Sequence, residues 1–155
     1  MKIVRVVCIL ILAGIVVGFG FLFSRVHAPP DLPTHEAVVA AVAVRGVTIP
    51  VVVADTAEKR TQGLSGRVSL PADMGMFFDM KTVGNHGIWM KNMAFPIDIV
   101  WIDEGLKIVT IVESARPDSY PKVFYPEVPA MYVLEVNAGF IEKRDISVGD
   151  VITVE

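Results

Sequence analysis

The stretch His86–Asp103, HGIWMKNMAFPIDIVWID, decides how this chain folds. Between Ile97 and Ile102 every residue is apolar except Asp98, and such a run is typical of a strand at the centre of a sheet. A carboxyl group among apolar neighbours requires a partner, because an unpaired buried charge is costly. We therefore predict that Asp98 is buried beside a cation or an amide group. The candidate partners are Lys91, Asn92, Arg60 and Arg67.

The first half of this stretch carries aromatic and polar side chains together. Read as a strand, Ile88–Met93 places Trp89 and Lys91 on one side, where the lysine stem can lie along the indole and raise its amine to an opening. Aromatic surface with a few polar groups is the usual make-up of a ligand pocket. We expect a small pocket lined by Trp89, Lys91, Asn92 and Asp98.

Strand patterns continue downstream of the stretch. A turn at Asp103–Gly105 leads into a strand over Leu106–Glu113, and a last strand covers Val151–Val154. Between them, the proline-rich segment Ser114–Pro129 is either a lid over the pocket or a rim that closes the core. Met131–Ala138 alternates in polarity, which places Glu135 and Asn137 on the face opposite Tyr132, Leu134 and Val136.

The upstream part predicts a hairpin and one short helix. Ala37–Ala54 reads as two valine-rich arms that turn at Arg45-Gly46, and Pro50 places the second arm at a sheet edge or at a bulge. Asp55–Glu58 forms a capping box for a helix that runs to Leu64. If the helix persists, Arg60 and Arg67 share one face, where they clamp a carboxylate or phosphate, pair with acidic groups of the sheet, or face water.

These patterns add up to about seven or eight strands with one helix and no internal repeat. We predict that residues 37–155 form a mainly β domain, a small β-sandwich or barrel with one short helix at its side.

The N-terminal residues predict a location at the membrane. Val6–Phe23 is an uncharged run of 18 residues, roughly 27 Å as a helix, which is close to the hydrocarbon thickness of a bilayer. Lys2 and Arg5 precede it and orient the rest of the chain away from the cytoplasm. Residues 1–27 are thus a signal anchor or a cleaved signal peptide, with the length favouring the anchor, and 28–36 are a proline-rich linker. We expect the domain at the inner membrane through residues 6–23, facing the periplasm, or secreted to the periplasm if cleaved.

Charge and cysteine content exclude several classes of function. Beyond Arg25 the chain has 11 basic and 17 acidic residues, a net charge near −6, which argues against nucleic acid as a partner. The single cysteine, Cys8, lies in the apolar run, so the exported part has no thiol chemistry. We predict no cofactor and no metal site. The exported methionines with His86 could ligate Cu(I), but core packing explains them better.

Several sequence blocks resemble family 192 of the domains of unknown function. They are Gly63-Leu64-Ser65-Gly66-Arg67, Ser69-Leu70-Pro71, Gly75-Met76-x-Phe78, Trp89-Met90-Lys91-Asn92-Met93, Pro96-Ile97-Asp98-Ile99 and Tyr132–Gly139. The resemblance implies a small prokaryotic protein, often exported, with a mainly β, sandwich-like domain and no established activity. Met93 departs from the family, where threonine is common. The polar positions that recur in the family correspond here to Arg60, Arg67, Lys91, Asn92, Asp98, Glu135 and Asn137.

Three functions remain open at this point. The first is a binding or accessory module of the cell envelope that holds a small molecule or an envelope protein at these polar residues and Trp89. The second is a hydrolase-type enzyme with Asp98 or Glu135 as general base; we favour a non-enzymatic role because no nucleophile-base pair or metal triad is visible. The third is a purely structural polar network, with function in protein-protein contact.

Overall fold

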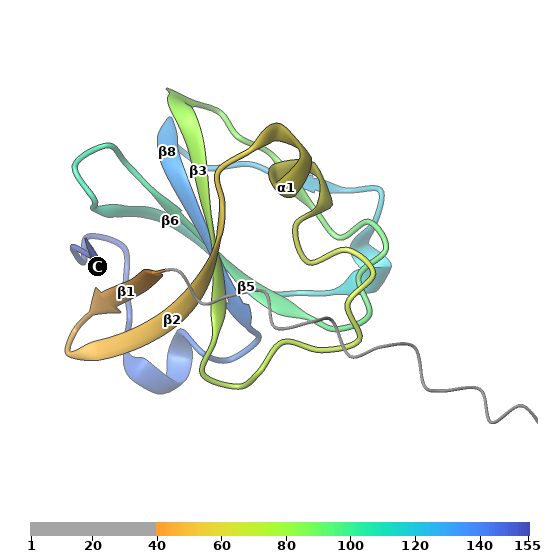
Figure 1. The fold of residues 1–155 in the computed structure, drawn as a ribbon, viewed down its shortest axis with the longest axis horizontal. Helices are drawn as coiled ribbons and strands as arrows, with labels where there is room; N and C mark the ends of the chain where they lie inside the picture. Colours follow the sequence, from red (N-terminus) through yellow and green to blue (C-terminus); the bar gives the residue numbers. More distant parts are fainter. Residues whose placement is uncertain (1–39) are drawn as a thin grey trace, which may run out of the picture. The chain divides into compact units, whose positions relative to one another are not determined.

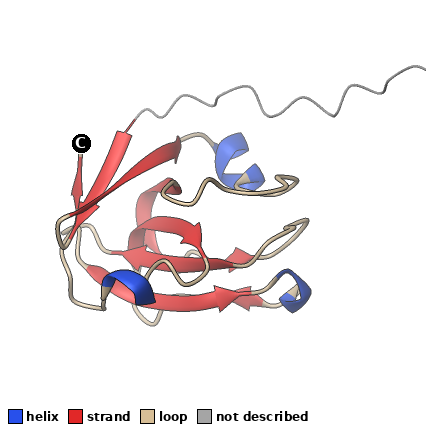
Figure 2. Cartoon of the chain, turned by 90° about the horizontal axis from the view of Figure 1, so that it is seen from below, coloured by secondary structure: helices blue, strands red, loops and turns tan. Residues whose placement is uncertain are grey.

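Seven strands form one mixed sheet in the computed structural model, which describes residues 40–155 (Figure 1). Their order across the sheet is β6-β5-β8-β3-β2-β1-β9, and β4 and β7 form a separate two-stranded ribbon. The bounds are β1 Ala40–Val44, β2 Val47–Ala54, α1 Ala57–Gln62, β3 Gly75–Gly84, β4 Ile88–Trp89, β5 Ile97–Ile102, β6 Ile108–Ala115, η1 Pro117–Ser119, β7 Val123–Phe124, β8 Ala130–Asn137, η2 Glu142–Arg144 and β9 Thr153–Val154. Figure 2 shows the helical segments as short pieces at the periphery of the strands.

The first hairpin forms where the sequence predicts it. Arg45 and Gly46 have φ values of 50° and 77°, and positive φ at both turn residues matches the right-handed twist of the flanking strands. The edge position predicted for the second arm is wrong, because β2 lies between β1 and β3. Its parallel pairing with β3 begins only at Val51, so Pro50 has no ladder amide to supply on that side.

The sheet buries side chains on both faces, and alternation along each strand decides which face a residue serves. On β8, Leu134 and Val136 join the core that contains Val100, whereas Val133 joins the core that contains Ile99. The central strand β5 is buried along its whole length, as the deciding stretch predicts. The buried indole of Trp101 on β5 donates to the backbone oxygen of His86 at 2.8 Å, so this stretch closes on itself.

A mainly β fold with one short helix is confirmed, but the described residues form no closed barrel. The two edge strands, β6 and β9, do not pair with each other. In the residues that precede these two strands, an isolated β-bridge joins Lys107 to Val151. Backbone hydrogen bonds from Ile108 to Asp150 and from Ile152 to Leu106 flank this bridge. Because β9 is only two residues long, this ladder stops before it can close the sheet. The second sheet is limited to the short β4-β7 ribbon.

The helix is shorter than predicted. Its N-cap is Thr56 rather than Asp55, and the Thr56 hydroxyl accepts from the Lys59 amide at 3.2 Å. It ends at Gln62. The C-cap residue Gly63 has a φ of 51°, which suits glycine, and its amide donates to the Lys59 oxygen at 2.8 Å. The helix does not reach Arg67, so the condition under which Arg60 and Arg67 would share one helical face is not met.

The predicted signal segment 1–27, the span 6–23 and the linker 28–36 lie outside the described residues. Within residues 40–155, no helix has the length and apolar character needed to cross a bilayer.

Candidate functional site

Glu135 is the most unusual buried residue of the sheet. It lies in the middle of β8 and is 5% exposed. Across the sheet it faces Met76 on β3 and Ile99 on β5, both apolar. No described residue forms a hydrogen bond with its carboxyl group. Every fully enclosed side-chain nitrogen or oxygen of the described residues has a hydrogen-bond partner, so the Glu135 oxygens must reach open space.

Burial changes the acid-base character of Glu135. Loss of hydration in this apolar site raises the pKa of the Glu135 carboxyl from 4.5 to about 8, because water stabilises the charged form and apolar neighbours do not. With a pKa of about 8, the side chain is mostly protonated at neutral pH. Glu135 can then donate a hydrogen bond, accept one, or give up a proton to a partner that stabilises its charge.

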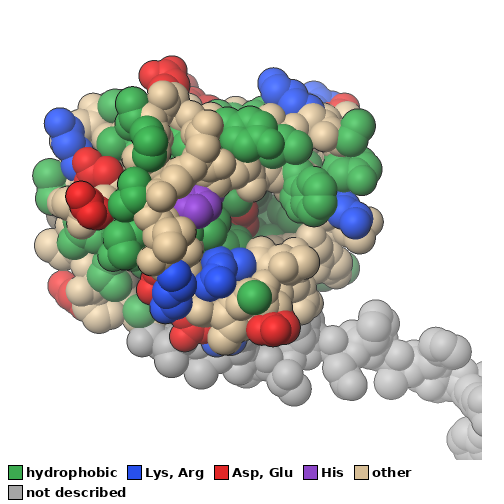
Figure 3. Space-filling view, turned by 90° about the horizontal axis from the view of Figure 1, so that it is seen from above, with side chains coloured by type: hydrophobic (Ala, Val, Ile, Leu, Met, Phe, Trp, Pro, Cys, Tyr) green, Lys and Arg blue, Asp and Glu red, His purple; other side chains and the backbone are tan. Residues whose placement is uncertain are grey.

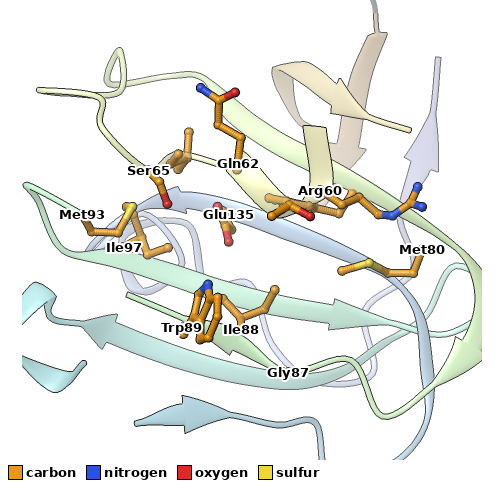
Figure 4. A pocket seen from close by; sticks show the side chains of 14 residues that line it. Arg60, Gln62, Ser65, Met80, Gly87, Ile88, Trp89, Met93, Ile97 and Glu135 are labelled. Carbon is orange, nitrogen blue, oxygen red and sulfur yellow. The ribbon is translucent and has the colours of Figure 1, made fainter. Parts of the chain in front are cut away.

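The open space above Glu135 is a pocket of about 90 Å³. Its walls come from α1 and the loop that follows, from β3, from β4 and from the start of β5. The side chains that form it include Arg60, Gln62, Ser65, Phe78, Met80, Ile88, Trp89, Met93 and Ile97. Figure 4 shows the Glu135 carboxyl group between these walls, with Met80 and Met93 toward opposite ends. The space-filling view in Figure 3 shows a hollow bordered by hydrophobic side chains, with an acidic side chain inside it.

Arg60 lines this pocket but is engaged elsewhere. Its Nη1 donates to the backbone oxygen of Asp79 on β3 at 3.1 Å. Figure 4 shows the guanidinium directed away from Glu135, toward the Met80 end. Arg60, one of the predicted site residues, thus lines the same pocket as Glu135 but forms no ion pair with it.

Trp89 forms the rim of the pocket and is 46% exposed. Tyr120 meets its ring edge-on, with centroids 6.2 Å apart, and the Lys91 Nζ lies 5.4 Å from its ring centroid. The β4-β7 pairing sets Trp89 opposite Val123. The proline-rich segment 114–129 therefore supports the Trp89 wall, and none of its residues lines the pocket. Of the two predicted roles, this position agrees with a rim rather than with a lid.

Lys91 and Asn92 lie outside the pocket lining, contrary to the prediction. The strand ends at Trp89, and both residues form an exposed turn in which Asn92 has a φ of 56°. Their backbone oxygens accept hydrogen bonds from the Ser65 hydroxyl at 2.8 Å and from the Gly66 amide at 2.9 Å. These two residues thus hold the loop after α1 in place, which positions Ser65 in the pocket wall.

Asp98 is buried and partnered, but the predicted partner is wrong. The residue is 0% exposed and lies on the sheet face opposite Glu135, in register with Val136. Its oxygens accept from the backbone amides of Ser114 at 2.8 Å and Ile141 at 3.1 Å. No ion pair of the described residues includes it. Asp98 therefore does not line the pocket, and its hydrogen bonds tie β5 to β6 and to the turn before η2.

The remaining predicted residues lie apart from Glu135. Asn137 donates its side-chain amide to the backbone oxygens of Leu70 at 3.1 Å and Pro71 at 3.0 Å. It borders a second depression of about 220 Å³, together with Phe140 and Arg144. Arg67 does not line the Glu135 pocket. Of the eight predicted site residues, the pocket thus contains Arg60, Trp89 and Glu135.

Sequence reasoning missed several pocket residues. Ser65 was visible as part of the Gly63–Arg67 block, and its small hydroxyl gave no separate sign of a site. Met80 and Met93 pack against the buried core, as the sequence predicts, and both also line this pocket. Figure 4 places them toward opposite ends, so they do not converge on one point. His86, the other proposed Cu(I) ligand, binds the backbone oxygen of Thr82 at 2.7 Å and does not line the pocket.

The sequence of this chain matches a family model and a related archaeal protein. The model of the DUF192 family, described as an uncharacterized ACR, matches residues 40–154. A UPF0127 protein of Thermococcus kodakarensis is 26% identical over 100 residues, which cover 64% of this chain and 61% of that protein, so the chain spans less than two thirds of this relative.

Two solved structures are also similar. A protein of unknown function from Novosphingobium aromaticivorans has a TM-score of 0.69 and 26% identity, covering 73% of this chain and 83% of that one. A proposed transcription regulator from Sinorhizobium meliloti has a TM-score of 0.70 and 32% identity, covering 74% and 92%.

Proposed function

The chain belongs to the DUF192 family, and on this premise we propose that it is a small-ligand binding domain of the cell envelope, with Glu135 as the polar anchor of its pocket. The observation that carries the proposal is the bare Glu135 carboxyl group. It is 5% exposed, forms no hydrogen bond with the described residues and opens into a pocket. Folding alone does not favour such a group, because a buried polar atom without a partner is costly. A ligand that supplies the missing partner explains why it is there.

A place in the envelope is supported by the sequence of residues 6–23 alone. Its length and the preceding Lys2 and Arg5 suit a segment that crosses or enters the membrane with the domain on the far side. The net charge near −6 beyond Arg25 disfavours nucleic acid. We therefore do not extend to this chain the transcription-regulator role proposed for the S. meliloti protein.

The enzymatic and the purely structural alternatives have less support. Asp98 is a poor general base, because two backbone amides occupy its oxygens. Glu135 has a pKa suited to proton transfer near neutral pH. However, the two hydroxyl side chains of the lining, Thr61 and Ser65, both donate to backbone oxygens, and neither forms a hydrogen bond with a side chain that could act as a base among the described residues. A structural network accounts for Asp98 and Asn137 but not for Glu135, which makes no bond in it.

Extraction of bound molecules tests the proposal. The full-length chain is purified in detergent, denatured, and the released small molecules are compared by mass spectrometry between wild type, Glu135→Leu and Asp73→Asn. Leucine removes the carboxyl with little loss of volume, and Asp73 lies at the surface in an ion pair with Arg144, outside the pocket. We expect a molecule in the wild-type and Asp73→Asn extracts that Glu135→Leu lacks. Identical extracts from all three, including empty ones, would contradict the proposal.

A further inference from the structure

We infer that the Glu135 pocket recognises a primary ammonium group, which would sit on the Glu135 carboxylate while its alkyl chain lies along the apolar walls and Trp89. This inference rests on the proposed function, since it names the class of ligand for the same pocket.

The pocket lacks a partner for the Glu135 carboxyl group. The carboxyl group of Glu135 is flanked by Met76 and Ile99 in the sheet and has no hydrogen-bond donor among the described residues. The charged lining residue other than Glu135 is Arg60, and its guanidinium is held by the Asp79 oxygen and directed away. The site therefore lacks both a donor and a positive charge. An ammonium group supplies both at once, with three N–H donors and one charge.

The walls of the pocket suit a cation that carries a hydrocarbon chain. Trp89 presents an aromatic ring at the rim, and Met80 and Met93 present polarizable thioethers toward the two ends. The Trp89 ring already attracts a cation, because the Lys91 Nζ lies 5.4 Å from its centroid. Ile88 and Ile97 add aliphatic surface for a hydrocarbon chain. An anionic ligand would instead meet the Glu135 carboxyl group.

The size of the pocket and the net charge of the chain also suit a small cation. A volume of about 90 Å³ exceeds what one ordered water needs, so it admits an ammonium group with a short chain. The whole chain has a net charge of −3, which favours the approach of cations over anions.

Proton linkage gives the inference a distinctive signature. The groups around Glu135 that carry or gain charge are Arg60 on α1 and, beyond the Trp89 rim, Lys91 in the turn after β4. An alkyl ammonium stays protonated below pH 9, since its pKa resembles that of lysine, about 10.4. Because Glu135 has a pKa of about 8, ammonium binding at pH 7 must displace most of one proton from it. Affinity should rise about tenfold from pH 6 to pH 7.

Two sources carry this chemistry, a free amine and a lysine side chain of a protein partner. Calorimetry of the full-length chain in detergent distinguishes them with two probes, n-butylammonium chloride and N-acetyl-lysine N-methylamide. Matching affinities, or tighter binding of butylammonium, indicate a free amine. An affinity at least about tenfold higher for the lysine derivative, a difference of 1.4 kcal/mol, indicates a lysine side chain. Butanol and sodium butyrate serve as the neutral and anionic controls.

We expect butylammonium to bind wild type about tenfold tighter at pH 7 than at pH 6, with about nine-tenths of a proton released at pH 7, measured from the buffer dependence of the heat. Glu135→Gln keeps the side-chain shape and should lose at least tenfold in affinity and all of the proton release. Lys91→Met removes a cation at the rim and should bind at least as tightly as wild type.

Binding that is unchanged in Glu135→Gln, independent of pH, or weakened in Lys91→Met would overturn the inference. Butanol or butyrate binding more tightly than butylammonium, with dependence on Glu135, would also overturn it while leaving the proposed function intact. If none of the four probes binds wild type, the ammonium inference fails, and the extraction experiment alone then decides the proposed function.

Discussion

Asp98 and Glu135 are two buried carboxyl groups on neighbouring strands of one sheet, and they differ in what surrounds their oxygens. Asp98 faces one side of the sheet and accepts from two backbone amides. Glu135 faces the other side, accepts from no described residue and opens into a pocket. Burial is nearly equal in the two, so burial does not separate a structural carboxyl from a functional one. The count of hydrogen-bond partners does.

The partners of Asp98 come from irregular backbone. Ser114 has a φ of 51°, and the β5-β6 pairing shifts register between Ile97 and Ile99, which turns the Ser114 amide toward Asp98. The Ile141 amide comes from the N-cap of η2. Glu135 instead lies in an unbroken ladder between β3 and β5, where the neighbouring amides are used by the sheet. A regular sheet therefore leaves its carboxyl without local donors.

The largest expected effect comes from removing the partnered carboxyl. Asp98→Ala leaves the Ser114 and Ile141 amides buried without acceptors, and hydrogen bonds to such a group contribute about 1.5–3 kcal/mol each. We expect the free energy of unfolding to fall by about 3–5 kcal/mol, measured by urea denaturation at pH 7. Glu135→Gln is the matched control and should cost far less. A loss below about 1 kcal/mol for Asp98→Ala would mean that Asp98 is not the structural carboxyl group described above.

The next effect is the pH dependence that Glu135 imposes. Its pKa is about 8 in the folded chain and near 4.5 when unfolded, so the folded state binds more protons between these values. Stability should therefore fall as pH rises from 4.5 to 8, by at most about 1.4 kcal/mol per pH unit, and level off above 8. Urea denaturation of wild type and Glu135→Gln at pH 5, 6.5 and 8 isolates this contribution. Parallel curves for the two proteins would mean that Glu135 is well solvated.

Asn137 offers a second polar side chain to set against Glu135, because it lies two residues away on the same face of β8. Its side-chain amide donates hydrogen bonds to the backbone oxygens of Leu70 and Pro71, so Asn137, like Asp98, has a structural role. Asn137→Ala should lower the free energy of unfolding by about 1–2 kcal/mol and leave butylammonium affinity unchanged. A loss of affinity without a loss of stability would place Asn137 in the ligand site instead.

Lys91 should give the smallest effect. Its side chain is exposed and contacts Trp89 through a cation-π interaction, which at exposed sites contributes about 0.5–1 kcal/mol. Lys91→Met keeps the aliphatic part of the side chain. The free energy of unfolding, measured by urea denaturation, should therefore change by about 0.5 kcal/mol or less. A loss of several kcal/mol would restore the hypothesis that Lys91 neutralises a buried carboxyl.

Local patterns predicted much of this fold. The Arg45-Gly46 turn, the buried strand at Ile97–Ile102 and the alternation that sends Glu135 to its own face follow from residue type and spacing. The requirement that Asp98 be partnered was also predictable. The partners were not, because backbone amides 16 and 43 residues away leave no mark in the sequence.

The pocket was only partly predictable for a similar reason. It forms where the end of α1, β4 and β8 meet, and this arrangement depends on tertiary packing rather than on periodicity. The short β4 and the turn after it moved Lys91 and Asn92 out of the expected lining. The early end of α1 likewise separated Arg67 from Arg60.

A titration of the Glu135 carboxyl group shows whether this buried group lacks a hydrogen-bond partner. Chain labelled with ¹³C at glutamate side chains, with Glu135→Gln used to assign the Glu135 carboxyl signal, can be titrated by NMR from pH 4 to pH 10. A bare, desolvated carboxyl group should titrate with a pKa of about 8. A midpoint near the ordinary value of 4.5 would show that water or an unrecognised partner already satisfies Glu135, and the pocket would lose its anchor.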